Sequence, residues 1–89
     1  MHIEKEILND SIALPRITVQ QAAELSGRAA QYIRIAMQRN LIDIGIAMKM
    51  PGSSKYYYDI RPQKLADYLG IDLISMYNRL GVQLNVKNL

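Results

Sequence analysis

Residues 17–42 have the sequence ITVQQAAELSGRAAQYIRIAMQRNLI, and this stretch predicts two short helices joined by a tight turn. Thr18 and Gln21 have the spacing of a capping box, so the first helix is expected to begin directly after the threonine. Gly27 is expected to end that helix, because a residue without a Cβ atom readily adopts the left-handed conformation that reverses the chain. A second helix then fits residues 29–39.

The second predicted helix has an apolar side and a polar, basic side. At about 100° per residue, its small and aliphatic side chains fall together on the inner side. The inner set is Ala29, Ile33, Ala36 and Met37, with Ala30 at its margin. The outer set is Arg28, Gln31, Ile35, Gln38 and Arg39, flanked by Tyr32 and Arg34. Two such helices match helix-turn-helix geometry, in which the second helix enters the major groove of DNA.

The outer residue types suit contacts with base edges. Arginine donates two parallel hydrogen bonds to guanine, glutamine pairs with adenine, and an exposed isoleucine touches a thymine methyl group. The plainer interpretation is a solvated amphipathic helix, because arginine and glutamine are also good helix formers. The residues that follow favour the interpretation as a DNA-binding helix.

Basic charge is concentrated in and after this helix. Residues 28–55 contain five cationic side chains and one acidic side chain, whereas the rest of the chain contains six and seven. A local excess of this kind is expected of a surface that contacts phosphate. The alternative is an ordinary solvated face, which charged segments commonly form.

A β-hairpin is predicted after the second helix, with strands at residues 47–49 and 56–58. The loop between them contains a Pro-Gly pair, which strongly favours a turn, and tyrosine has a high strand propensity. This hairpin would be the wing of a winged helix-turn-helix, and its hydroxyl and ammonium groups suit DNA phosphates. The candidate phosphate contacts are Lys49, Ser53, Ser54 and Lys55.

The three consecutive tyrosines at residues 56–58 raise a second possibility, a stacking platform for unpaired bases. Strand alternation places Tyr56 and Tyr58 on one face of the hairpin and Tyr57 on the other. We therefore expect at least one of these faces to pack against the core.

The flanking segments suggest three parts: an N-terminal lead at 1–16, a DNA-binding domain at 17–71, and a C-terminal helix and tail at 72–89. The lead is expected to contain a short helix and, at residues 16–17, a short strand. Further helices are predicted at 62–69 and 73–80, and residues 82–86 alternate like a strand. The apolar surplus after residue 72 indicates either a cover for the core or a self-association surface. A dimer is slightly favoured, because repeated half-sites favour one.

Residues 17–71 together resemble the excisionase family of small phage and transposon DNA-binding proteins. They resemble, more distantly, the DNA-binding heads of MerR-type regulators. The residues that carry the likeness are ITVQQAAELSG, YIRIAMQRNLI and the run IGIAMK…KYYYDIRPQKLADYLG. The likeness covers a little over half of the chain, and its motifs are patterns rather than invariant signatures.

The resemblance implies a mainly α fold with a small β-hairpin, a winged helix-turn-helix; the extra C-terminal helix predicted from the residues has no counterpart in the shortest excisionases. The resemblance also implies sequence-specific binding of double-stranded DNA near recombination sites, often as a cooperative array at adjacent sites, with an integrase as a further partner. The roles carried over fall on Gln31, Arg34, Ile35 and Gln38 in the recognition helix and on Lys49 and residues 53–55 in the wing.

The chain departs from the family pattern at two positions. Arg28-Ala29-Ala30 stands where many relatives have a serine that caps the recognition helix, so Ser26 or a frayed first turn must substitute. Ile35 stands where charged or aromatic residues are common, so the base preference of relatives does not transfer.

Other functions are compatible with these residues. A phage-type transcriptional regulator would use the same fold, and the small subunit of a phage terminase carries a related winged helix. A protein–protein adaptor would instead use the apolar C-terminal segment. A steep loss of DNA affinity with rising salt would distinguish the DNA-binding proteins from the adaptor.

No enzyme, cofactor or metal site is expected. The only histidine is His2, there is no cysteine, and the chain has neither a Gly-rich phosphate loop nor paired carboxylates in an apolar setting. No apolar run approaches the roughly 18 residues that span a bilayer, and the first residues lack the apolar middle of a signal peptide. Together with the absence of cysteine, these features predict a cytoplasmic protein without a membrane partner.

Overall fold

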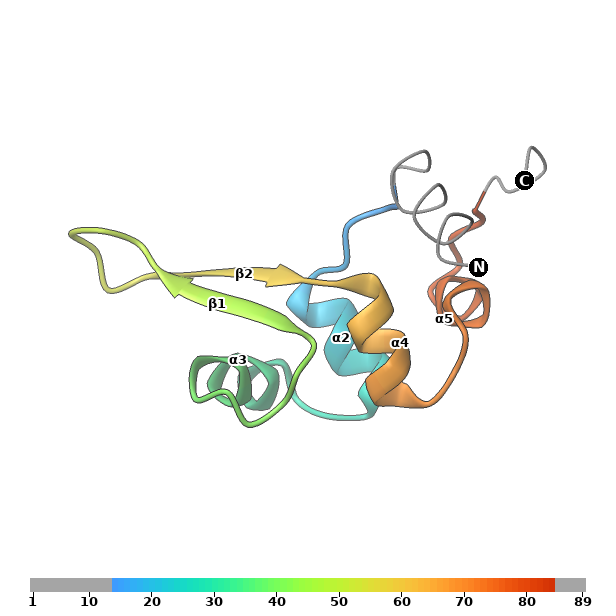
Figure 1. The fold of residues 1–89 in the computed structure, drawn as a ribbon, viewed down its shortest axis with the longest axis horizontal. Helices are drawn as coiled ribbons and strands as arrows, with labels where there is room; N and C mark the ends of the chain where they lie inside the picture. Colours follow the sequence, from blue (N-terminus) through green and yellow to red (C-terminus); the bar gives the residue numbers. More distant parts are fainter. Residues whose placement is uncertain (1–13, 85–89) are drawn as a thin grey trace, which may run out of the picture.

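The computed structural model describes residues 14–84, which form four α-helices and one two-stranded antiparallel hairpin (Figure 1). In chain order the elements are α2 (Val19–Ser26), α3 (Ala30–Gln38), β1 (Gly45–Lys49), β2 (Tyr56–Ile60), α4 (Pro62–Leu69) and α5 (Leu73–Arg79). The hairpin lies beside α3 and extends away from the other helices, and α5 lies toward the opposite end of the molecule (Figure 1). The predicted combination of helices with a small hairpin is confirmed at this level. The helix predicted in the N-terminal lead lies outside the described residues.

The ends of α2 are set by its own sequence. The backbone N–H of Gln21 donates to Thr18 Oγ1 at 3.1 Å, and the backbone N–H of Thr18 donates to Gln21 Oε1 at 2.9 Å. Gly27 adopts the left-handed conformation with φ of 70°, and the next N–H, that of Arg28, donates to the Ala23 carbonyl at 3.0 Å. Both predicted signals, the capping box and the glycine stop, are therefore confirmed.

One hydrophobic core joins all four helices to the base of the hairpin. Each helix contributes at least two buried side chains, and Ile44 and Ile60 enter the core where the hairpin begins and ends. The other buried members are Ile17, Ala22, Ala23, Ile33, Met37, Leu65, Ala66, Met76 and Tyr77. Much of the apolar surplus after residue 72 thus covers the core, since α5 supplies the last two of these residues.

A hydrogen bond joins α5 to the segment before α2, and a side chain caps the N-terminus of α5. The Tyr77 hydroxyl donates to the Pro15 carbonyl at 2.6 Å, and burial raises the pKa of Tyr77. At the start of the helix, the Asp72 carboxylate accepts the backbone N–H of Ser75 at 2.7 Å and its hydroxyl at 3.0 Å. These bonds hold the pKa of Asp72 below its ordinary value.

Two predicted strands are wrong. Residues 16–17 and 82–84 have no strand partner and are irregular, and the rest of the predicted strand at 82–86 lies outside the described residues. Alternating apolar side chains there do pack on the core, since Val82 and Leu84 are half-buried against it. The alternation of apolar and polar residues at these positions therefore indicates burial of side chains. It does not indicate the backbone hydrogen bonds that define a strand.

The hairpin is longer than predicted at its base and has five paired positions, from Gly45 opposite Ile60 to Lys49 opposite Tyr56. As alternation requires, the rings of Tyr56 and Tyr58 lie on one face, with centroids 6.2 Å apart. Tyr58 is half-buried and packs against the core, whereas Tyr56 and Tyr57 are exposed. The expectation that one tyrosine face reaches the core therefore holds through Tyr58.

Gly45 is the position at which the hairpin tolerates no side chain. Its φ is 153°, and a Cβ atom there would overlap the Asp59 carbonyl oxygen and lie 2.8 Å from the Ile60 Cα atom. We expect Gly45→Ala to lower the free energy of unfolding by at least about 2 kcal/mol, because strain and overlap add. Urea denaturation followed by circular dichroism measures this loss.

Gly52→Ala is the matched control, since Gly52 has a φ of 70° but nothing lies near its missing Cβ atom. Its loss should be about 1 kcal/mol, from the backbone conformation alone. Equal losses in the two variants would mean that the close approach of β1 to β2 does not stabilise the hairpin.

Candidate nucleic-acid interface

One side of α3 is buried in the core, and the other side is mostly exposed, with the hairpin next to it. Ile33, Ala36 and Met37 are buried, which confirms three members of the predicted inner side. Asn40 ends the helix in the left-handed conformation with φ of 57°, and the N–H of Leu41 donates to the Ala36 carbonyl at 2.8 Å. The outward direction of the remaining side chains follows from this burial.

The start of α3 corrects two predicted positions. The helix begins at Ala30, so Arg28 lies in the preceding turn and Ala29 is an exposed, extended N-cap. A helical wheel does not apply to residues outside the helix, which is why Ala29 was wrongly placed on the inner side. Ser26 does not cap α3 either, because its hydroxyl donates to the Ala23 carbonyl at 3.2 Å.

The outward side of α3 forms a ridge that combines amide, guanidinium and apolar groups. We define the α3 ridge as Gln31, Tyr32, Arg34, Ile35 and Arg39; Arg34 is half-buried and the other four are exposed. Arg39, predicted inside the helix, is its C-cap residue. Arg34 Nη1 donates to Gln31 Oε1 over a long 3.5 Å, which leaves other donors of both side chains available.

Arg28 joins this ridge although it is not part of the helix. Its guanidinium carbon lies 4.8 Å from the centroid of the Tyr32 ring, within the range of a cation–π contact. The ring therefore orients a cation at the N-terminal end of the ridge.

Gln38 lies on the outward face of α3, about 20° from Gln31 at 100° per residue, but the hairpin engages its side chain. It is half-buried, and its Nε2 donates to the Tyr58 hydroxyl of β2 at 2.6 Å. The reason is tertiary: the hairpin lies against this edge of α3 and supplies a polar partner 20 residues away in the sequence. Tyr58 in turn had no predicted polar role, and only strand alternation signalled its direction.

The four predicted hairpin residues are all exposed. At the loop, the N–H of Met50 donates to the Lys55 carbonyl at 3.0 Å, and the N–H of Lys55 donates to the Ser53 hydroxyl at 3.0 Å. Lys49 pairs with Tyr56, so it lies on the same hairpin face as Tyr58, which points to α3. Lys49 therefore lies on the same side of the hairpin as α3.

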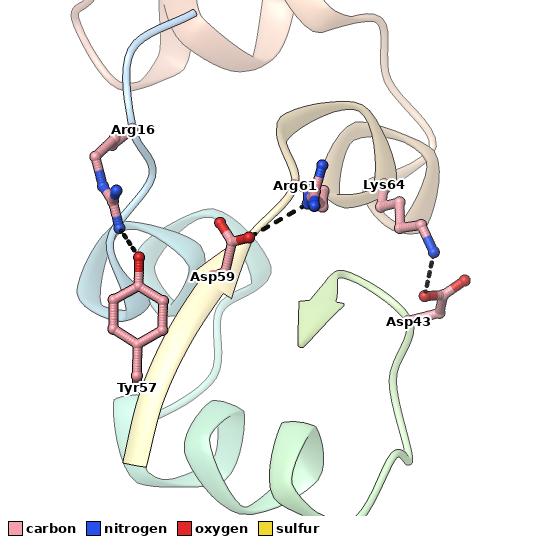
Figure 2. A network of polar contacts seen from close by, with 6 residues as sticks. All are labelled: Arg16, Asp43, Tyr57, Asp59, Arg61 and Lys64. Carbon is pink, nitrogen blue, oxygen red and sulfur yellow. Dashed lines mark hydrogen bonds and ion pairs between the residues drawn. The ribbon is translucent and has the colours of Figure 1, made fainter. Parts of the chain in front are cut away.

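Residues 28–55 contain one acidic side chain, Asp43, and it pairs with Lys64 of α4 at 3.0 Å. A second ion pair joins Arg61 to Asp59 of β2 at 3.4 Å (Figure 2). Within residues 14–84, no acidic side chain pairs with any cation of the ridge or hairpin. These unneutralised cations are Arg28, Arg34, Arg39, Lys49 and Lys55.

The opposite face of the hairpin has a different character. Arg16 donates to the Tyr57 hydroxyl at 3.0 Å and lies 6.0 Å from the centroid of that ring (Figure 2). Ile46 and Met48 on this face are each 48% exposed. Arg16 was not singled out in the sequence, because no local pattern links it to a tyrosine 41 residues away.

The described residues show little that suits other chemistry. Among residues 14–84, no group of three or more His, Cys, Asp or Glu side chains is placed to hold a metal ion. None of the helices in that range has the length and apolar content needed to cross a bilayer.

Comparisons of the chain with protein-family models, curated proteins and solved structures found no match. The function is therefore inferred from the site itself.

The N-terminus of α3 offers a test of its local geometry. Ala29 has the extended backbone of an N-cap but no side-chain acceptor for the first free N–H groups. We expect Ala29→Ser to raise the free energy of unfolding by about 1 kcal/mol, because its hydroxyl can accept one of these donors. Ala30→Ser, one residue inside the helix, is the control and should destabilise slightly. Urea denaturation compares the two, and a less stable Ala29→Ser variant would contradict the observed start of α3.

Proposed function

We propose that this chain binds double-stranded DNA sequence-specifically, as a winged helix-turn-helix protein. α2 and α3 would be the helix-turn-helix and the β1–β2 hairpin its wing. The observation that carries the proposal is the α3 ridge standing beside a hairpin, with five cations that no acidic side chain neutralises within the described residues. A surface of this charge and shape suits the major groove and its flanking phosphates.

The ridge would read bases through its central residues. Arg34 suits a guanine edge, Gln31 an adenine edge, and Ile35 a thymine methyl group, and each bidentate pair contributes roughly 1–3 kcal/mol of discrimination. Arg28 and Arg39 lie at the two ends of α3, where contacts with the phosphates along the groove are expected.

The hairpin would contribute affinity without sequence preference. Lys49 and Lys55 would pair with phosphates, and the Ser53 and Ser54 hydroxyls can donate to phosphate oxygens. Although the Ser53 oxygen accepts the N–H of Lys55, its own hydroxyl hydrogen is still available as a donor. Such contacts fix the register of the protein on the duplex.

The biological role we propose is that of an excisionase of a phage or mobile element. The support is the resemblance of residues 17–71 to that family, which implies DNA bending that favours excision by a partner integrase, without catalysis by the chain itself. Binding as a homodimer or cooperative array in the cytoplasm belongs to the same proposal. A phage-type transcriptional regulator is the alternative, because it would use the same surface at differently located sites.

The recognition residues are tested by the double variant Gln31→Ala with Arg34→Ala. For a duplex selected from a random pool, we expect its affinity to fall at least thirtyfold, which is about 2 kcal/mol for two lost base contacts. The fold should persist, since neither side chain belongs to the core. Gel-shift titration measures the affinity, and circular dichroism checks the fold.

The matched control replaces one glutamine and one arginine far from the ridge, with Gln83→Ala and Arg79→Ala. Both residues are exposed, and Arg79 is the last residue of α5. The control should bind like the unmodified protein. Equal affinity of the ridge variant and the control would refute the assignment of α3 as the recognition helix.

The hairpin contacts are tested by Lys49→Ala with Lys55→Ala. We expect weaker binding by a similar factor on every sequence, because phosphate contacts carry no base information. The slope of log affinity against log salt should become shallower by about 2, close to 0.9 for each lost contact. An unchanged slope would place the hairpin off the DNA, and no duplex binding at any salt would favour the adaptor function.

A further inference from the structure

We propose that Tyr58 is a positioning residue that sets the angle of the hairpin relative to α3, and that Gln38 serves this pairing rather than base reading. The inference rests on the proposed DNA-binding function and deepens it. The observations behind it are two hydrogen bonds to consecutive hydroxyls of β2, one on each face of the hairpin.

The first bond joins the last turn of α3 to the middle of β2. Gln38 Nε2 donates to the Tyr58 hydroxyl at 2.6 Å, and both residues are half-buried. Tyr58 pairs with Ala47, the third of the five paired positions of the hairpin. Within residues 14–84, this is the one hydrogen bond between α3 and the strands.

The second bond approaches from the opposite face. Arg16 donates to the Tyr57 hydroxyl at 3.0 Å from the segment that precedes α2 (Figure 2). Because this contact is exposed, water competes with it more than with the half-buried bond. The bond between Gln38 and Tyr58 should therefore dominate.

The hairpin is otherwise attached by Ala47 and the Tyr58 ring, which pack against the core, and by contacts at its base. The N–H of Arg61 donates to the Ile44 carbonyl at 2.8 Å, and Ile44 and Ile60 are buried there. Beyond the base, the hairpin extends away from α2 and α4 (Figure 1). Apolar packing is non-directional, so the hydrogen bond midway along β2 adds the contact that defines the direction of the hairpin.

This direction matters for the distance between the two parts of the DNA surface. Lys49 lies two residues beyond Ala47 along β1, so it moves with the hairpin while the α3 ridge stays with the core. Simultaneous contact of ridge and hairpin with one duplex needs a fixed spacing between them, and a preformed spacing lowers the cost of binding.

The same bond removes Gln38 from the set of base readers. A glutamine that recognises adenine uses its amide oxygen and nitrogen together. Here the nitrogen donates to Tyr58 and the side chain is half-buried at the edge facing the hairpin. Tyr58 thus has a role other than stacking on unpaired bases.

The test uses Tyr58→Phe, which removes only the hydroxyl, and Gln38→Met, which keeps the length of the side chain without its amide. Tyr56→Phe is the matched control, because Tyr56 shares the face of Tyr58 and its hydroxyl has no hydrogen-bond partner within residues 14–84. Residual dipolar couplings of backbone amides in the free full-length protein report the angle of the hairpin relative to the helices. Gel-shift titration on the selected duplex and on all its single-base variants reports affinity and base preference.

We expect Tyr58→Phe and Gln38→Met each to change the hairpin angle and to weaken binding about threefold to tenfold, the size of one lost hydrogen bond. The base preference should stay unchanged at every position, and the double variant should be no weaker than either single one. Tyr56→Phe should behave like the unmodified protein.

A changed base preference confined to one or two adjacent positions in Gln38→Met would make Gln38 a base reader and overturn the inference. Unchanged dipolar couplings in Tyr58→Phe would overturn it as well. If the unmodified protein binds no duplex while the couplings still change in both variants, the proposed function fails and the positioning role stands.

Discussion

Burial of one side of α3 is the constraint from which the candidate site follows. Ile33 has no exposed surface and Met37 only 3%, and both pack with α2 and with the base of the hairpin. A nine-residue helix anchored in this way has no freedom to rotate, so its other side chains lie away from the core, where Gln38 meets the hairpin and most of the α3 ridge is exposed. The composition of the ridge is thus a consequence of the core, because a helix with one apolar stripe has one possible outward side.

The hairpin and the α3 ridge together form a surface of two parts. Its base is fixed by Ile44 and Ile60 in the core and by the close approach of Gly45 to the backbone of β2. Asp43, the one acidic residue of residues 28–55, pairs with Lys64 of α4 and not with a cation of the α3 ridge or the hairpin loop. Geometry and charge therefore favour the same ligand, a duplex with a groove between two lines of phosphate.

The proposed DNA-binding function rests on the chemistry of this surface rather than on likeness to a known structure. A small helical fold occurs in proteins of many functions. The groups that suit DNA are a guanidinium, an amide and an aliphatic side chain on the α3 ridge, with lysines on the neighbouring hairpin. The apolar residues on the other hairpin face, Ile46 and Met48, do not contribute to this ligand. The proposed excisionase role and its alternative, transcriptional control, are separate from the proposed DNA-binding chemistry.

Local sequence signals determined the secondary structure wherever a few neighbouring residues set the backbone. Three such signals act over at most four or five residues: the capping box at Thr18 and Gln21, the helix stop at Gly27 and the alternation of the tyrosines. Periodicity likewise identified Ile33 and Met37 as the inner side of α3. It failed at Ala29, where the helix has not yet begun, and at residues 82–84, where alternation reflected burial without strand pairing.

Only the tertiary structure decided which polar groups are free to meet a ligand. Three polar pairs join residues that are far apart in the sequence: Gln38 with Tyr58 (20 residues apart), Arg16 with Tyr57 (41) and Asp43 with Lys64 (21). No local pattern encodes these partners, because each depends on how the core orients the hairpin and α4. The sequence by itself therefore determined the helices, the hairpin and the residue types of the surface. The packing of the core decided which of those side chains bind one another and which remain exposed.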